Sequence, residues 1–214
     1  MLVRYYPIFL NIRDKKCVVV GGGDVALRKV KILLECGGKV SVISPTLHPD
    51  LMKLVENKSI DLMQRDYKPG DLKGAAIVVS ATDEDEVNHK VADEAKRAGV
   101  LVNVADDPEP SDFIVPSVLR RGDLTIAVST GGKSPALARK VRTRLEESFG
   151  MEYAVLLSQI EEVRSTVREK GMDVDAETWR DALDLDLLIE LVREGQNEKV
   201  KTLLLDQFKC KIDI

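Results

Sequence analysis

The segment with the clearest chemical use is the glycine-rich run Gly21–Ala26, which reads GGGDVA. It fits the pattern G-x-G-x-x-A, in which the first glycine permits a tight turn and the second lets a pyrophosphate approach the backbone. The alanine at the end of the pattern permits close packing of a helix on a strand. Amide groups at the start of that helix would hold the phosphates. The spacing therefore predicts a dinucleotide site at Gly21, Gly23, Asp24 and Val25.

The flanking sequence supports this interpretation. A β-branched run, Lys16–Val20, precedes the glycines, and apolar residues follow at helical spacing, including Val30 and Leu33. A strand before the motif and an amphipathic helix after it are the context in which such a motif binds a dinucleotide. The alternative is a glycine turn between strand and helix that holds no ligand.

The second strand ends without the expected acidic residue. A dinucleotide site usually has Asp or Glu about twenty residues after the glycines, where it holds the ribose hydroxyls. Ser44 stands there in this chain, and no arginine is near it to bind a 2′-phosphate. The sequence thus favours NAD over NADP, although the residue that usually decides the choice is missing. Ser44 is included among the predicted cofactor-binding residues.

The elements that position these residues alternate along the chain. Strands are predicted over residues 16–20, 40–43, 60–64, 75–80 and 100–104, with helices between them that include Pro49–Glu56. Such alternation is typical of an α/β fold with a parallel, Rossmann-type sheet. Two strands and a helix follow: strands over 113–119 and 124–129 joined by Arg120–Asp123, then a helix that Ser134 caps. A helical tail completes the chain, with one helix predicted to hold both Trp179 and Leu188. We therefore expect a Rossmann domain over 1–112, a small region over 113–149 and a helical domain over 150–214.

Polar residues follow the fourth and fifth strands, where ligands of open α/β sheets bind. Thr82 and Asp83 follow the fourth strand, and Asn103 and Asp106 lie at the end of the fifth. We expect Thr82, Asp83 and Asn103 to contact the cofactor, although Thr82 or Asp83 would also serve to cap the next helix. Asp106 is the candidate catalytic carboxylate, and the alternative is that it only starts the turn before Pro108.

Composition excludes several classes of function. The net charge of −4 lacks the basic surplus of a nucleic-acid binder. Three widely spaced cysteines exclude the common zinc patterns and a disulfide framework, which favours a reducing cytoplasm. No apolar run is long enough for a membrane span, and the N-terminal stretch lacks a signal peptide's apolar region. His48 and His89 have no ligand partners nearby in sequence, so no metal site is predicted.

Several segments together resemble one known family, the precorrin-2 dehydrogenases, which includes the N-terminal module of siroheme synthase. The resemblance runs in order over about residues 3 to 149. The segments that carry it are Val18–Lys29, Ser80–Asp83 with Asn88, Asn103–Asp106, Phe113–Ser117, Ala127–Pro135 and Leu137–Arg139.

The resemblance implies an NAD-dependent oxidation of precorrin-2 to sirohydrochlorin, in siroheme biosynthesis, by a homodimer. The active site would lie between the nucleotide and a dimerisation region at 113–149, with Asp106 as the general base. The tetrapyrrole carries many carboxylates, so the resemblance also implies a substrate-binding set of hydroxyls, amides and cations. Its candidate members are Ser129, Thr130, Gly131, Gly132, Lys133 and Arg139.

Four alternatives stay open. Some family members also insert Fe²⁺ into sirohydrochlorin, and the sequence does not decide whether this chain does. A non-catalytic NAD-sensing Rossmann module would share the glycine run. The helical tail could dock another protein, and a basic run on a helix such as that near Arg139 is often only a solvated face.

Overall fold

The computed structural model describes the backbone of residues 4–212 and the side chains of residues 4–208. The chain forms two compact units, Met1–Val115 and Pro116–Ile214. The three-part division expected from the sequence, with boundaries after residues 112 and 149, stays a prediction.

The first unit is built on a parallel sheet of five strands in the order β3-β2-β1-β4-β5. The register places Val20 beside Ser80, and Ser80 beside Val104. The carboxyl ends of β1, β4 and β5 therefore meet at one edge, and the predicted Rossmann-type sheet is confirmed. The strands are β1 (Lys16–Val20), β2 (Lys39–Ile43), β3 (Asp61–Met63), β4 (Ile77–Ser80) and β5 (Leu101–Val104).

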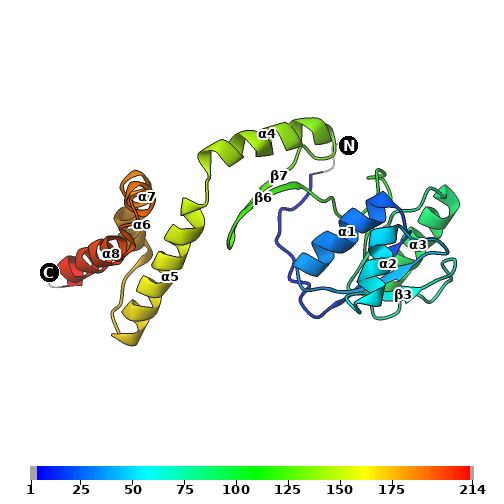
Figure 1. Cartoon of the computed structure of the whole chain (residues 1–214), viewed down its shortest axis with the longest axis horizontal. Helices are drawn as coiled ribbons and strands as arrows, with labels where there is room; N and C mark the ends of the chain where they lie inside the picture. Colours follow the sequence, from blue (N-terminus) through cyan, green and yellow to red (C-terminus); the bar gives the residue numbers. More distant parts are fainter. Residues whose placement is uncertain (1–3, 213–214) are drawn as a thin grey trace. The chain divides into compact units, whose positions relative to one another are not determined.

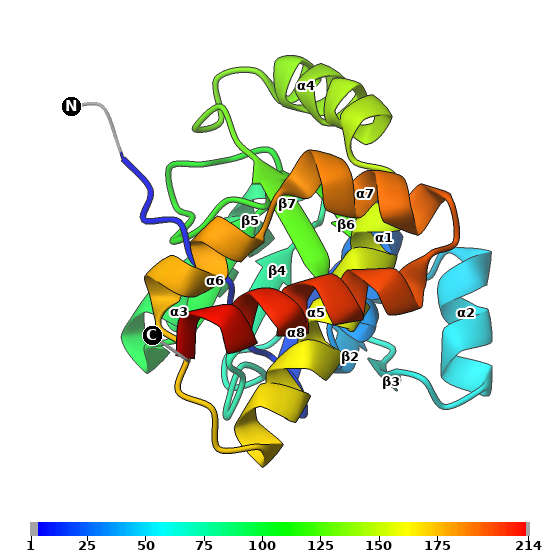
Figure 2. The same cartoon turned by 90° about the vertical axis from the view of Figure 1, so that its left-hand side faces the viewer.

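Helices cover both faces of this sheet (Figures 1 and 2). They are α1 (Asp24–Glu35), α2 (Pro49–Glu56) and α3 (Asp85–Ala98). Alternate residues of β1 point to opposite faces, so that Val19 packs in a core with α1 and α2, while Val18 packs in a core with α3. Because both faces are buried, β1 is a continuous apolar run.

The second unit begins with a hairpin of β6 (Ser117–Arg121) and β7 (Leu124–Val128). The prediction placed Arg120 and Arg121 in the connection and began the first strand at residue 113, and both points were wrong. Arg121 pairs with Leu124, so only Gly122 and Asp123 form the turn. Gly122 adopts a φ of 55°, which suits such a tight connection. Pro116 has no amide proton to offer a ladder, and β6 begins just after it.

In the described part of the chain, five helices follow the hairpin. They are α4 (Pro135–Ser148), α5 (Glu152–Glu169), α6 (Ala176–Ala182), α7 (Leu185–Arg193) and α8 (Asn197–Ile212). The predicted cap of α4 is confirmed, because the Ser134 hydroxyl accepts a hydrogen bond from the Leu137 amide at 3.2 Å. The prediction of a single helix through Trp179 and Leu188 was wrong. The helix is interrupted between α6 and α7, and the Asp184 carboxylate caps α7 by accepting from the Leu187 amide.

The last four helices share one core, in which Leu156 of α5, Leu188 of α7 and Phe208 of α8 are buried. Figures 1 and 2 show α6, α7 and α8 gathered beside α5. Among the described residues, no helix is long and apolar enough to cross a membrane.

The crossover between β3 and β4 is fastened to α3 by one carboxylate. Glu94 accepts hydrogen bonds from the Tyr67 hydroxyl, from the Gly70 amide at 3.0 Å and from the Leu72 amide at 3.2 Å. Burial, followed by the hydrogen bond to Glu94, raises the pKa of Tyr67. This carboxylate therefore satisfies three hydrogen-bond donors in a loop that lies outside the strand pairing of the sheet.

We predict that Glu94→Ala lowers the free energy of unfolding by about 2 kcal/mol, since it leaves these donors without their acceptor. Glu86→Ala on the same helix removes only an exposed ion pair with Lys90 and should leave stability almost unchanged. Urea denaturation of the two variants tests this, and equal midpoints would contradict it.

Candidate active site

The glycine turn after β1 is held by close backbone contacts. Gly21 has a φ of 118°, and a Cβ there would lie 2.2 Å from the carbonyl oxygen of Ala81, just after β4. A Cβ on Gly22 would lie 2.0 Å from the carbonyl oxygen of Thr46. Gly21 therefore makes the tight turn expected of the first glycine. Position 22 also needs a glycine, because the backbone of the neighbouring loop leaves no room for a side chain.

Gly23 differs from the two glycines before it. A Cβ there would meet nothing within 4 Å, so open space lies in front of its backbone. It is the N-cap of α1, and no side chain caps the helix, which leaves the first amides, including those of Asp24 and Val25, available to a ligand. Ala26 is fully buried against the sheet. The turn has the shape of a pyrophosphate cradle.

His48 and Ser44 support the loop beside this cradle. The His48 amide donates to the Gly22 carbonyl at 2.7 Å, and its Nδ1 accepts from the Asp50 amide at the start of α2. His48 is therefore the N-cap residue of α2. Ser44 is buried, and its hydroxyl donates to the Thr46 carbonyl at 2.6 Å. The observed contact of Ser44 is internal to the loop, and its cofactor role stays a prediction.

A polar network follows β4. The Asn88 side chain accepts a hydrogen bond from the Ser80 hydroxyl at 2.7 Å and donates to the Thr82 carbonyl at 3.0 Å. The Thr82 hydroxyl accepts from the Glu84 amide, and Glu84 rather than Thr82 or Asp83 is the N-cap residue of α3. Thr82 is thus held in a fixed turn at the carboxyl edge, and Asp83 is exposed beside it.

Asp106 lies just after β5 in an unusual backbone conformation. Its φ is 61°, a left-handed value that few residues with a Cβ adopt, and its side chain is exposed. Such strain persists only where the surroundings enforce it. The carboxylate predicted for catalysis therefore stands at the edge of the sheet on a constrained turn.

Two residues that the sequence analysis missed hold this turn. The Ser111 hydroxyl accepts from the Val104 amide at 2.9 Å and donates to the Asp107 carbonyl at 2.7 Å. The Asp112 carboxylate accepts from the Val102 amide at 3.0 Å. They satisfy amides on the free edge of β5. The available signal was the short polar pair Ser-Asp after a proline-rich turn.

Asn103 joins three segments of the first unit. It is buried, its side-chain amide donates to the Phe113 carbonyl at 3.0 Å, and its Oδ1 accepts from the Lys29 ammonium at 3.2 Å. Burial lowers the pKa of Lys29, the charge of Asp106 opposes that shift, and Arg28 adds to it. Lys29 was not predicted as a site residue, because a lysine on an amphipathic helix normally faces solvent.

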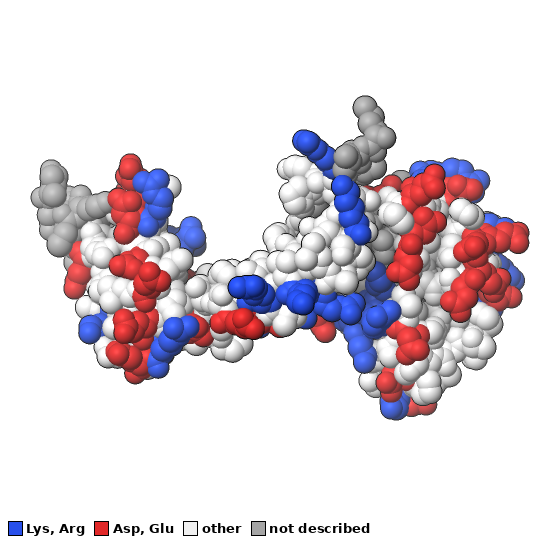
Figure 3. Space-filling model, turned by 90° about the horizontal axis from the view of Figure 1, so that it is seen from above, with Lys and Arg blue, Asp and Glu red and all other residues white. Residues whose placement is uncertain are grey.

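The predicted substrate residues of the second unit lie in and after the turn between β7 and α4. The Thr130 hydroxyl accepts from the Ser134 amide, and the Ser129 hydroxyl accepts from the Gly131 amide, both at 3.0 Å. Gly131 and Gly132 have positive φ values. This brings Ser129, Thr130, Gly131, Gly132 and Lys133 into one turn, whereas Arg139 lies further along α4. Figure 3 shows Lys and Arg side chains gathered over α4.

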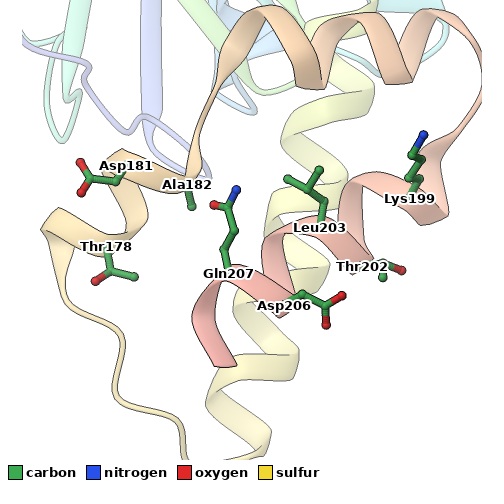
Figure 4. Close-up of a pocket in the computed structure, with 8 residues that line it drawn as sticks. All are labelled: Thr178, Asp181, Ala182, Lys199, Thr202, Leu203, Asp206 and Gln207. Carbon is green, nitrogen blue, oxygen red and sulfur yellow. The ribbon is translucent and has the colours of Figure 1, made fainter. Parts of the chain in front are cut away.

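A pocket between helices of the second unit is lined by none of the predicted site residues. It is lined by residues of α6 and α8, among them Thr178, Ala182, Leu203 and Gln207 (Figure 4). No group of three or more metal-ligating side chains occurs within the described part of the chain.

Comparisons with known proteins agree with this geometry. A family described as sirohaem biosynthesis protein, central, matches residues 121–148. The chain is 40% identical over 197 residues to siroheme synthase of Methylobacillus flagellatus, covering 91% of this chain and 42% of that protein. It is also 40% identical over 184 residues to siroheme synthase of Chromobacterium violaceum, covering 85% and 39%. The chain thus spans less than half the length of these relatives, and the expected resemblance to siroheme synthases is confirmed.

A solved structure shares the fold. "SirC, precorrin-2 dehydrogenase" matches with a TM-score of 0.70 and 22% identity, covering 96% of this chain and 99% of that one. The glycine turn itself falls within a second family match, to putative NAD(P)-binding proteins, over residues 8–117 of the 214. The chain belongs to this putative NAD(P)-binding family.

Proposed function

We propose that the protein is an NAD-dependent dehydrogenase that oxidises precorrin-2 to sirohydrochlorin. The observation that carries the proposal is an open glycine cradle on the same sheet edge as a constrained carboxylate, Asp106. The siroheme synthases among its relatives and the precorrin-2 dehydrogenase with the same fold support the substrate.

The residues of the first unit fit a dinucleotide. The amides of Gly23, Asp24 and Val25 would hold the pyrophosphate, because a Cβ at Gly23 would enter open space and no side-chain hydrogen bond caps the start of α1. Thr82, Asp83 and Asn103 would border the rest of the cofactor at the ends of β4 and β5, and Ser44 would border its ribose. NAD⁺, when bound, supplies the acceptor for a hydride.

Asp106 would take the proton that leaves with the hydride. Oxidation of precorrin-2 removes two hydrogens, one with its electron pair and one as a proton, so a base is needed beside the hydride acceptor. An exposed carboxylate at the carboxyl end of β5 meets that need. Its constrained turn holds the backbone in place while its side chain receives the proton on a carboxylate oxygen.

The turn before α4 would bind carboxylates of the substrate. Lys133 and Arg139 are exposed cations, and Gly131 and Gly132 form an exposed turn next to the start of a helix, where the Gly132 amide would face the substrate. We also propose a cytoplasmic homodimer. Leu137 and Val141 support it, because they are exposed apolar side chains on α4. A monomer mass in sedimentation would refute the dimer.

The proposed activity is tested by mixing the purified protein with precorrin-2 and NAD⁺ in the absence of metal. We expect NADH and sirohydrochlorin to form in equal amounts, followed by absorbance. NAD⁺ binding without turnover would favour a sensing module, and consumption of added Fe²⁺ together with sirohydrochlorin would reveal an additional iron insertion.

The cradle is tested by two glycine substitutions. Gly23→Ala should weaken NAD⁺ binding at least about tenfold, because the added Cβ would occupy the space proposed for the pyrophosphate. It should lower the free energy of unfolding by at most about 1 kcal/mol, because that Cβ contacts no protein atom. Gly21→Ala should weaken NAD⁺ binding and also destabilise the fold, because its Cβ meets the Ala81 carbonyl. Calorimetric titration and thermal unfolding measure both effects. Unchanged NAD⁺ affinity in Gly23→Ala would contradict the cradle.

The base is tested by Asp106→Asn. Asparagine tolerates the left-handed conformation well, so the variant should keep the fold and NAD⁺ affinity while turnover falls at least about a hundredfold. Asp107→Asn is the matched control, because it keeps the oxygen that accepts from the Glu109 amide, and it should turn over normally. Wild-type turnover by Asp106→Asn would remove the assignment.

A further inference from the structure

Lys29 carries a charge that the proposed mechanism does not yet use. It lies on α1, is only partly exposed, and donates one hydrogen bond, to the buried Asn103 at 3.2 Å. In the described residues, no carboxylate lies within ion-pair distance of its ammonium. Two of its three donors are thus left for another partner.

This charge is incompletely balanced. Removing an ammonium from water is unfavourable unless an anion or a full set of acceptors replaces the water. Burial lowers the pKa of Lys29, the charge of Asp106 opposes that shift, and nearby Arg28 adds to it. A bound anion would supply the missing compensation.

The position of Lys29 indicates which anion. Asn103, to which it is hydrogen-bonded, is three residues before Asp106, and the charge of Asp106 raises the pKa of Lys29. The cradle for phosphates lies at the start of α1, more than a turn of helix before Lys29. The anion at Lys29 is therefore one that arrives beside the reacting centre at Asp106. A ligand that offered only an uncharged carbonyl oxygen would not balance the charge of the ammonium.

We propose that the Lys29 ammonium, held by Asn103, binds a carboxylate of the tetrapyrrole substrate beside Asp106. The inference rests on the proposed function. A purely structural tether is the contrasting account, in which Lys29 only fixes the Asn103 amide and with it the Phe113 carbonyl.

The two accounts are separated by Lys29→Gln, whose shorter side chain keeps an amide donor but carries no charge. We expect the dissociation constant of sirohydrochlorin, titrated without NAD⁺, and the KM of precorrin-2 to rise at least about tenfold. NAD⁺ affinity and Tm should be unchanged, and Lys29→Arg should restore binding to within a few-fold. Lys31→Gln is the matched control on an exposed position of the same helix and should behave as wild type.

The dependence on pH gives a second readout. The ammonium binds a carboxylate only while protonated, so sirohydrochlorin affinity should fall as pH rises through a pKa lower than that of an ordinary lysine. Asp106 and Arg28 are the charged groups that act on Lys29. Lys29→Arg should keep its affinity at the same pH.

The outcomes distinguish this inference from the function on which it rests. Wild-type protein that neither binds sirohydrochlorin nor oxidises precorrin-2 would overturn the proposed function. Wild-type binding that is matched by Lys29→Gln would overturn the role of Lys29 alone. A lower Tm and weaker NAD⁺ binding in Lys29→Gln, with tetrapyrrole binding retained, would show instead that Lys29 only fixes the Asn103 side chain.

Discussion

The close approach of Gly21 to the Ala81 carbonyl is the contact on which the site depends. It requires the absence of a side chain, since a Cβ would lie 2.2 Å from that oxygen. Because of it, the chain turns sharply out of β1 at the point where β4 also ends. The first amides of α1 and the Thr82 turn then lie at one edge of the sheet, together with the end of β5. A larger residue at position 21 would separate the helix from this edge.

The rest of the first unit stiffens that edge by polar contacts. Asn88 ties α3 to the turn after β4, and Ser111 and Asp112 occupy the free edge of β5. Asn103 connects β5 to α1 through Lys29. Each contact satisfies a buried or edge group that would otherwise be costly to leave unpaired. The strained φ of Asp106 persists because this network closes the loop around it.

The sequence predicted the sheet well for a physical reason. Buried parallel strands are continuous apolar runs, and the glycine and proline breaks between them are local signals, so the elements from Lys16 to Val104 were found in the right order. The Arg120–Asp123 connection and the break at Asp184 were not predicted correctly, because each depends on a turn or cap of one or two residues. Lys29, Ser111 and Asp112 were missed since their roles arise from long-range partners, such as Asn103 for Lys29.

The central claim is that a dinucleotide lies with its pyrophosphate on the amides after β1, facing Asp106. A crystal structure of the protein with NAD⁺ tests it most directly. The account predicts phosphate oxygens within hydrogen-bond distance of the Gly23, Asp24 and Val25 amides, with the nicotinamide toward the end of β5. A dinucleotide bound elsewhere, or a glycine turn left empty at saturating NAD⁺, would contradict it.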